Sequence, residues 1–159
     1  MDARVTWDKD MQFVGVSDSG FAVRMDSKSS PQTGAGPVEL TLMALAGCTA
    51  MDVISILRKK RQHVSEFHVE AHADRATDYP TVITTAVLEY VVSGHGIDEA
   101  ALLRAIELSI KQYCPVHAML AKAFPIDLRY SIFEGDAAGE RRLVSHGSYR
   151  PMLPWTESG

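Results

Sequence analysis

Three short segments near the start of the chain alternate or cluster apolar residues, at 3–8, 11–17 and 20–26. Turn-forming residues separate them, and the pair Ser19-Gly20 is typical of a tight hairpin. The pattern predicts a three-stranded β-meander. Small and helix-breaking residues follow at 27–36, which predicts a loop of the kind that often borders a functional site.

A long apolar helix is predicted next, over about 37–62. Pro37 suits the first helical position because its missing N–H would be unpaired there, and Glu39 places a carboxylate near the positive helix end. Between residues 40 and 57 the helix is apolar on nearly every side, which predicts burial on nearly every side. A protomer of this size can hardly surround such a helix alone, so a homodimer is expected.

The same apolar run is long enough to raise the question of a membrane span. Asp52, Gly47 and several hydroxyl residues interrupt it, and the remaining sequence is strand-rich with no second such run. We therefore expect the buried central helix of a soluble protein and no membrane association.

The second half predicts two strands, a helix, a short helix and a last strand, over 64–75, 80–93, 98–113, 115–123 and 126–133. Asp98 is the expected N-cap of the longer helix. Cys114-Pro115 interrupts it, because the residue before proline avoids the α region and proline suits a new helix start. Cys114 is thus the expected N-cap of the short helix. Together with the meander, this order of elements predicts an α+β fold.

Residues 1–134 are expected to form one domain, since 159 residues fit a single domain. From residue 135 to 159 the pattern dissolves, and a C-terminal tail is predicted. It is expected to be flexible, or to dock on its own body or on a partner subunit through apolar residues such as Leu143, Tyr149 and Trp155.

The formal net charge of −4 argues against a nucleic-acid partner, which would need a basic patch or stripe. The basic run at 58–61 ends the predicted helix, where cations are favoured by the helix dipole. The first ten residues lack the apolar region of a secretory signal, and two cysteines are too few for a secreted disulfide scaffold. A reducing, cytoplasmic location is therefore expected.

Cys48 and Cys114 are the only cysteines and carry the candidate chemistry. Cys48 lies in the apolar helix, where it is either an inert small hydrophobe or a catalytic thiol. As an N-cap, Cys114 faces unpaired N–H groups that stabilise a thiolate, with His117 as a further donor, or else it merely tolerates a kink. A Cys-x-x-His metal half-site completed by Cys48 is a third reading. Zinc sites usually show two local ligand pairs, so no metal or cofactor is expected.

Four runs carry a family resemblance: Gly36-Pro37-Val38-Glu39-Leu40, Ala46-Gly47-Cys48-Thr49-Ala50-Met51-Asp52-Val53, Arg104-Ala105-Ile106-Glu107-Leu108-Ser109 and Lys111-Gln112-Tyr113-Cys114-Pro115-Val116. With its two cysteine motifs 66 positions apart, the chain over about 3–134 resembles the OsmC/Ohr family, the osmotically inducible and organic hydroperoxide resistance proteins. The closest match is the YhfA-like branch. The resemblance implies an intertwined α+β dimer with its central helices back to back and two active sites at the interface.

The resemblance also implies a chemistry. In the peroxidase members, the cysteine matching Cys48 attacks an organic hydroperoxide and becomes a sulfenic acid. The cysteine matching Cys114 resolves it as a disulfide, which a dithiol such as a lipoyl group, or a small thiol, reduces. Glu39 matches a helix-start glutamate that prepares the thiolate together with an arginine, and no arginine here occupies the expected motif.

Two features of the helix bear on that chemistry. Nine residues separate Glu39 from Cys48, about half a turn out of phase in a straight helix, so Glu39 is not expected to touch Cys48 of its own chain. Asp52 lies one turn after Cys48 and would oppose thiolate formation if ionised. The alternative function is non-enzymatic, a dimeric module that binds an apolar ligand or senses redox state through its cysteines.

Overall fold

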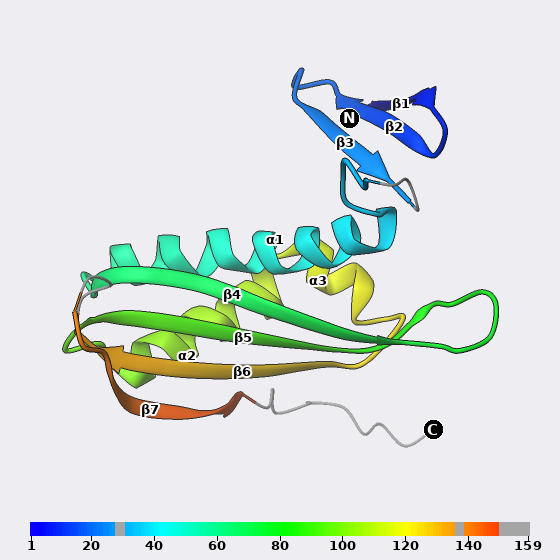
Figure 1. The fold of residues 1–159 in the computed structure, drawn as a ribbon. Helices are drawn as coiled ribbons and strands as arrows, with labels where there is room; N and C mark the ends of the chain where they lie inside the picture. Colours follow the sequence, from blue (N-terminus) through cyan, green and yellow to red (C-terminus); the bar gives the residue numbers. More distant parts are fainter. Residues whose placement is uncertain (28–30, 136–138, 150–159) are drawn as a thin grey trace. The chain divides into compact units, whose positions relative to one another are not determined.

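The computed structural model describes residues 1–27, 31–135 and 139–149. The chain divides into two compact units, Met1–Met43 and Ala44–Gly159 (Figure 1). The secondary structure is mixed α+β, as the sequence predicts, with a three-stranded and a four-stranded sheet.

The first unit holds the predicted meander, β1 (Ala3–Lys9), β2 (Gln12–Ser17) and β3 (Ala22–Asp26), paired antiparallel in that order. Gly20 closes the second turn at a φ of +85°, a conformation that residues with a Cβ rarely adopt. Every residue of β1 is exposed, and Trp7 keeps 63% of its surface accessible. An apolar hollow of about 250 Å³ is lined by Val5, Met11, Phe13, Met25, Asp26, Ser27 and Pro37. This small sheet therefore has apolar side chains that its own unit does not cover.

Helix α1 (Pro37–Lys59) begins with a capping interaction. The Glu39 carboxylate accepts a hydrogen bond of 2.6 Å from the Gly36 backbone N–H, the reciprocal half of a capping box. Arg58 and Lys59 lie in the last turn, where the negative end of the helix dipole stabilises cations. By length and composition α1 could cross a membrane, a test that the core helix of a soluble protein also passes.

One stripe of α1 is buried, formed by Leu45, Thr49, Val53 and Leu57 at intervals of four residues. The expectation that the helix is buried on nearly every side is wrong for the single chain, since Met51 keeps 74% of its surface exposed. The reason is geometric: neighbouring elements of one chain cover one face of a helix, and the opposite apolar face needs another surface.

The second unit contains the larger sheet, with β4 (His63–Arg75), β5 (Ile83–His95), β6 (Ile126–Glu134) and β7 (Arg142–Tyr149) in that order (Figure 1). Strands β5 and β6 are parallel, so their connection must cross over the sheet. It does so through α2 (Glu99–Leu108), η1 (Ser109–Tyr113) and α3 (Pro115–Leu120). The core consists of inward residues of β5, chiefly Leu88, Tyr90 and Val92, and the buried faces of α1 and α2.

The crossover helices differ from the predicted ones in detail. Asp98 caps α2 as expected, its side chain accepting a hydrogen bond from the Ala100 N–H at 3.0 Å. The last turn, Ser109–Tyr113, is a π-helix rather than a continuation of α2, and the short helix ends at Leu120 instead of 123. Cys114 is its N-cap, as predicted.

Strand β7 lies in the segment that the sequence pattern left without an element. It pairs antiparallel with β6, and Gly147 stands opposite Tyr130, whose ring leaves no room for a Cβ there. Glu99 accepts hydrogen bonds from both Tyr130 and Ser145, which ties β7 to the start of α2. This part of residues 135–159 therefore docks on the body of its own chain. Residues 150–159, including Trp155, lie outside the described residues.

Candidate active site

The structure brings the two cysteines together from elements far apart in sequence. Cys48 comes from the middle of α1 and Cys114 from the N-cap of α3. Both are free thiols, and their sulfur atoms lie within 4.8 Å of each other. Cys48 is half-buried, whereas Cys114 is only 3% exposed. Cys48 is thus the thiol that solvent and small molecules reach.

The π-turn before α3 sets the position of Cys114. The Cys114 N–H donates to the Ser109 carbonyl at 2.8 Å, the i to i−5 bond that defines a π-helix. Cys114 itself is extended, at φ −82° and ψ 101°, as a residue before proline prefers. Its sulfur then accepts a hydrogen bond from the His117 backbone N–H at 3.3 Å.

The expected low pKa of Cys114 is wrong. Burial raises the pKa of the Cys114 thiol to about 12, and the hydrogen bond to Cys48, the charge of Cys48 and the charge of Asp52 add to the rise. The N–H of His117 opposes it but is outweighed. The sequence predicts the N-cap geometry correctly, but desolvation of the sulfur has a larger effect on its pKa than the cap does. Cys114 therefore stays a protonated thiol at neutral pH.

Asp52 completes a cluster with the two thiols. A carboxylate oxygen of Asp52 lies within 4.8 Å of both sulfur atoms. The Ser109 hydroxyl donates to Asp52 Oδ2 at 2.9 Å. Among the residues that the structure describes, no lysine or arginine forms an ion pair with Asp52. Sequence reasoning placed Asp52 one helical turn from Cys48, but the Ser109 contact depends on the crossover connection and carries no sequence signal.

Tyr90 is a buried polar residue beside the cluster that sequence reasoning missed. Its side chain is fully buried, and no described residue gives its hydroxyl a hydrogen bond of normal geometry. Burial raises the pKa of Tyr90 to about 12; Thr49 opposes the rise, while Cys114 and Asp52 add to it. The hydroxyl therefore stays protonated at neutral pH and can act as a donor. The available signal was a tyrosine at an inward position of an otherwise apolar strand.

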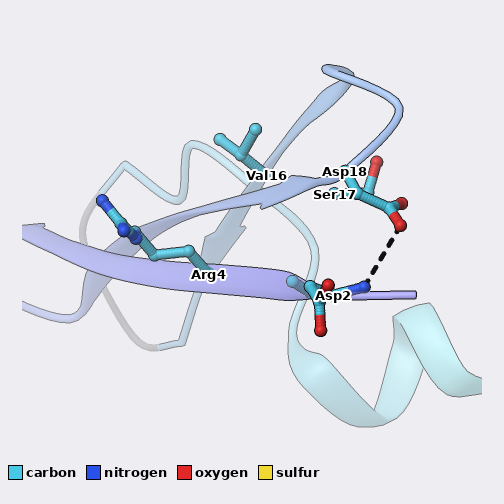
Figure 2. A pocket seen from close by; sticks show the side chains of 6 residues that line it. Asp2, Arg4, Val16, Ser17 and Asp18 are labelled. Atoms are coloured by element: carbon cyan, nitrogen blue, oxygen red, sulfur yellow. Dashed lines mark hydrogen bonds between the residues drawn. The ribbon is translucent and has the colours of Figure 1, made fainter.

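Glu39 and the early arginines occupy other surroundings in the described structure. Glu39 is exposed and bonded to Gly36, as described for the helix cap. Arg4 lines a hollow of about 470 Å³ on the three-stranded sheet with Asp2, Ala3, Val16, Ser17 and Asp18, in which the Asp2 N–H donates to Asp18 at 3.2 Å (Figure 2). Arg24 lies on β3 of the same sheet. That hollow contains no thiol.

A third hollow shares Asp52 with the thiol cluster. It has a volume of about 330 Å³ and is lined by Asp52, Ser55, Ile56, Lys59, Leu108 and Tyr113. Asp52 belongs to both the hollow and the cluster. Ile56 and Leu108 give it apolar walls, and Lys59 places an ammonium group at its edge. A small organic molecule therefore has a binding surface beside the thiols.

Comparison with known proteins agrees with this architecture. A sequence model of the OsmC-like protein family matches residues 29–129. Protein YhfA of Escherichia coli strain K12 is 39% identical over 132 residues, which cover 83% of this chain and 98% of YhfA. A hypothetical protein from Aquifex aeolicus VF5 superposes with a TM-score of 0.76 at 24% identity, covering 85% and 97% of the two chains. The organic hydroperoxide resistance protein OhrB of Bacillus subtilis superposes with a TM-score of 0.56 at 16% identity, covering 82% and 98%.

The fold and the paired thiols define an α+β protein with a two-cysteine site between its central helix and its crossover connection. The family model matches most of the chain, and YhfA is similar over nearly its whole length. The chain belongs to the OsmC/Ohr family, and YhfA is among its close relatives.

Proposed function

We propose that this protein is a thiol-dependent peroxidase that reduces organic hydroperoxides through Cys48 and Cys114, in defence against oxidative stress. The observation that carries the proposal is the pairing itself, two free sulfurs within 4.8 Å of each other on elements 66 positions apart. In a reducing cytoplasm, where we place the protein, such a pair is more often catalytic than structural.

The exposure of the two thiols supports the division of labour. The half-buried Cys48 attacks the hydroperoxide as a thiolate, the O–O bond breaks, an alcohol leaves, and Cys48 becomes a sulfenic acid. Cys114 is buried and protonated at rest; it loses its proton to the departing hydroxide as its sulfur attacks the sulfenic sulfur, and water leaves as the disulfide forms. A dithiol or lipoyl-type reductant restores both thiols. Ile56 and Leu108 line the hollow that shares Asp52 with the thiol cluster, and they give the apolar part of a hydroperoxide a surface to contact.

A homodimer forms part of the proposal. OsmC/Ohr family members are generally dimeric. The exposed apolar face of α1 and the uncovered side chains of the β1–β3 sheet are surfaces that a second subunit would bury. Glu39 stays in the proposal through its match to the helix-start glutamate of the family, and no contact between its carboxylate and Cys48 supports it.

One observation favours the non-enzymatic alternative. Asp52 sits beside both sulfurs without an ion-pair partner among the described residues, and its charge opposes a thiolate. A site of this kind suits a redox sensor or an apolar-ligand module better than a fast peroxidase. Turnover measurements therefore decide between the two functions.

The test is steady-state consumption of cumene hydroperoxide and hydrogen peroxide by the reduced protein, with dihydrolipoamide or glutathione as the reductant. We expect the organic peroxide to be preferred over hydrogen peroxide, because Ile56 and Leu108 line the hollow that shares Asp52 with the thiol cluster. We expect the dithiol to be preferred over glutathione, because the family resemblance implies a dithiol reductant. Thiols that react no faster than free cysteine would overturn the peroxidase assignment and favour the ligand-binding module.

Replacing Tyr90 by phenylalanine is expected to raise stability and to lower activity. Loss of a buried hydroxyl without a hydrogen bond should raise the free energy of unfolding by about 1 kcal/mol. If the hydroxyl donates to the anion that develops at the thiols, hydroperoxide reduction should slow about 10- to 100-fold, since such a bond to a charged group is worth about 1.5–3 kcal/mol. Urea denaturation and stopped-flow kinetics give the two values. An unchanged rate would make Tyr90 a packing residue only.

A further inference from the structure

Three potential metal ligands meet at the thiol cluster. The Sγ atoms of Cys48 and Cys114 and a carboxylate oxygen of Asp52 all lie within 4.8 Å of one another. Thiolate and carboxylate are ligands that Zn²⁺ accepts, at about 2.3 Å and about 2.0–2.2 Å. On a tetrahedral ion these bonds place the ligand atoms about 3.5–3.8 Å apart. The ligand atoms therefore need to come at most about 1.3 Å closer to reach this spacing.

The surroundings orient two of the three ligands. The Ser109 hydroxyl holds Asp52 through Oδ2 at 2.9 Å, and the His117 backbone N–H holds the Cys114 sulfur at 3.3 Å. Such outer contacts fix ligand orientation at metal sites. Cys48 and Asp52 are four residues apart on α1 and share one helix face. His117, which the Cys-x-x-His spacing suggested as a ligand, is not a member of this cluster.

The charge of the cluster points to a cation as well. Two ionisable thiols and a carboxylate converge here, and the described residues supply no lysine or arginine in an ion pair with Asp52. A divalent cation is the group that compensates such a set of ligands and holds both thiols as thiolates. Three protein ligands leave the fourth tetrahedral position to water.

We propose that Cys48, Asp52 and Cys114 bind one Zn²⁺ in the reduced protein, and that zinc and hydroperoxide compete for the same thiols. The binding stands on the ligand geometry alone, whereas the competition rests on the proposed peroxidase function. Zinc thus keeps the site in a resting state that oxidation ends.

Oxidation of the two thiolates by a hydroperoxide releases the zinc ion. The Cys48 thiolate attacks the hydroperoxide, the O–O bond breaks, and the alcohol leaves with one proton from water. The Cys114 thiolate then forms the S–S bond, and the displaced hydroxide leaves as water with a second proton. The disulfide has lost two electrons to the peroxide and both thiolate ligands, so Zn²⁺ retains only Asp52 and dissociates.

The test titrates the full-length reduced protein with Zn²⁺ by calorimetry and with Co²⁺ by absorption spectroscopy. We expect one ion per chain, with a thiolate-to-cobalt charge-transfer band and tetrahedral d–d bands. Because loss of a merely supporting residue costs about 10- to 100-fold in metal affinity, Cys48→Ser and Cys114→Ser should each weaken binding by at least about 100-fold. Asp52→Asn should weaken it at least about 10-fold, and Asp127→Asn, an exposed carboxylate on β6, should not.

The disulfide form of the unmodified chain is a second measurement that needs no variant, and it should bind no zinc. A chromogenic chelator should also detect one Zn²⁺ released per hydroperoxide consumed. Absence of the charge-transfer band, or zinc affinity unaffected by both cysteine substitutions, would overturn the proposal. Zinc binding without hydroperoxide reduction would defeat only the peroxidase function, and peroxide reduction without zinc binding only the metal site.

Discussion

Replacing Cys48 by serine should abolish hydroperoxide reduction, whereas replacing Cys114 should leave a single turnover. Without the half-buried thiol there is no attacking sulfur, so the rate should fall by about a thousand-fold or more. Without Cys114 the first oxidation should stay fast, but the sulfenic acid at Cys48 then has no thiol within 4.8 Å to resolve it. It should be over-oxidised to sulfinic acid. Mass spectrometry after one equivalent and then excess cumene hydroperoxide distinguishes these products.

The same pair of variants tests whether the roles are reversed. If Cys48→Ser still reacts quickly, with oxidation at Cys114, then the buried thiol is the attacking one despite its raised pKa. Wild-type protein, which keeps both thiols, is the matched control. Circular dichroism of each variant shows whether a lost rate reflects a lost fold.

Replacing Met51 by glutamate should break the proposed dimer. Met51 lies on the exposed face of α1, opposite the stripe of Leu45, Thr49 and Val53. A carboxylate buried there without a partner costs several kcal/mol, which corresponds to a dimer at least about 100-fold weaker. Sedimentation velocity at micromolar concentration should show a dimer for the wild type and the 17.4 kDa chain, folded or unfolded, for the variant.

The conservative change Met51→Leu preserves the apolar surface and is the matched control for that experiment. It should sediment as the wild type does. A wild-type protein that sediments as a folded monomer, or a Met51→Glu variant that stays fully dimeric, would show that this face of α1 is not the interface. The exposed apolar residues of the helix would then need another explanation.

Local signals in the sequence predicted most elements correctly. Asp98 and Cys114 act as N-caps because capping depends on a few neighbouring residues, and the meander and the strands up to β6 follow from alternation and turns. Strand β7 was missed for a physical reason. An edge strand takes its backbone hydrogen bonds from its neighbour, here β6, and needs few apolar residues of its own.

The sequence identifies the residues of the site better than their arrangement, because arrangement depends on the whole fold. The family motifs singled out both cysteines, but their separation in space depends on the path of the crossover connection. The pKa of Cys114 is raised instead of lowered, because burial is a property of the whole fold and outweighs the effect of the helix cap. Tyr90 contributes to the site only through its inward position on β5, which no local motif marks.

The π-turn at Ser109–Tyr113 has a consequence for how such a site arises. A π-turn holds one residue more than the α-turn it replaces, and each residue advances the chain by about 100° around the helix axis. The wider turn takes up the extra residue, so with one residue fewer here the helix would be regular and the segment after it would keep nearly the same direction. A single-codon insertion can therefore be taken up within this turn, and Cys114 keeps its position near Cys48.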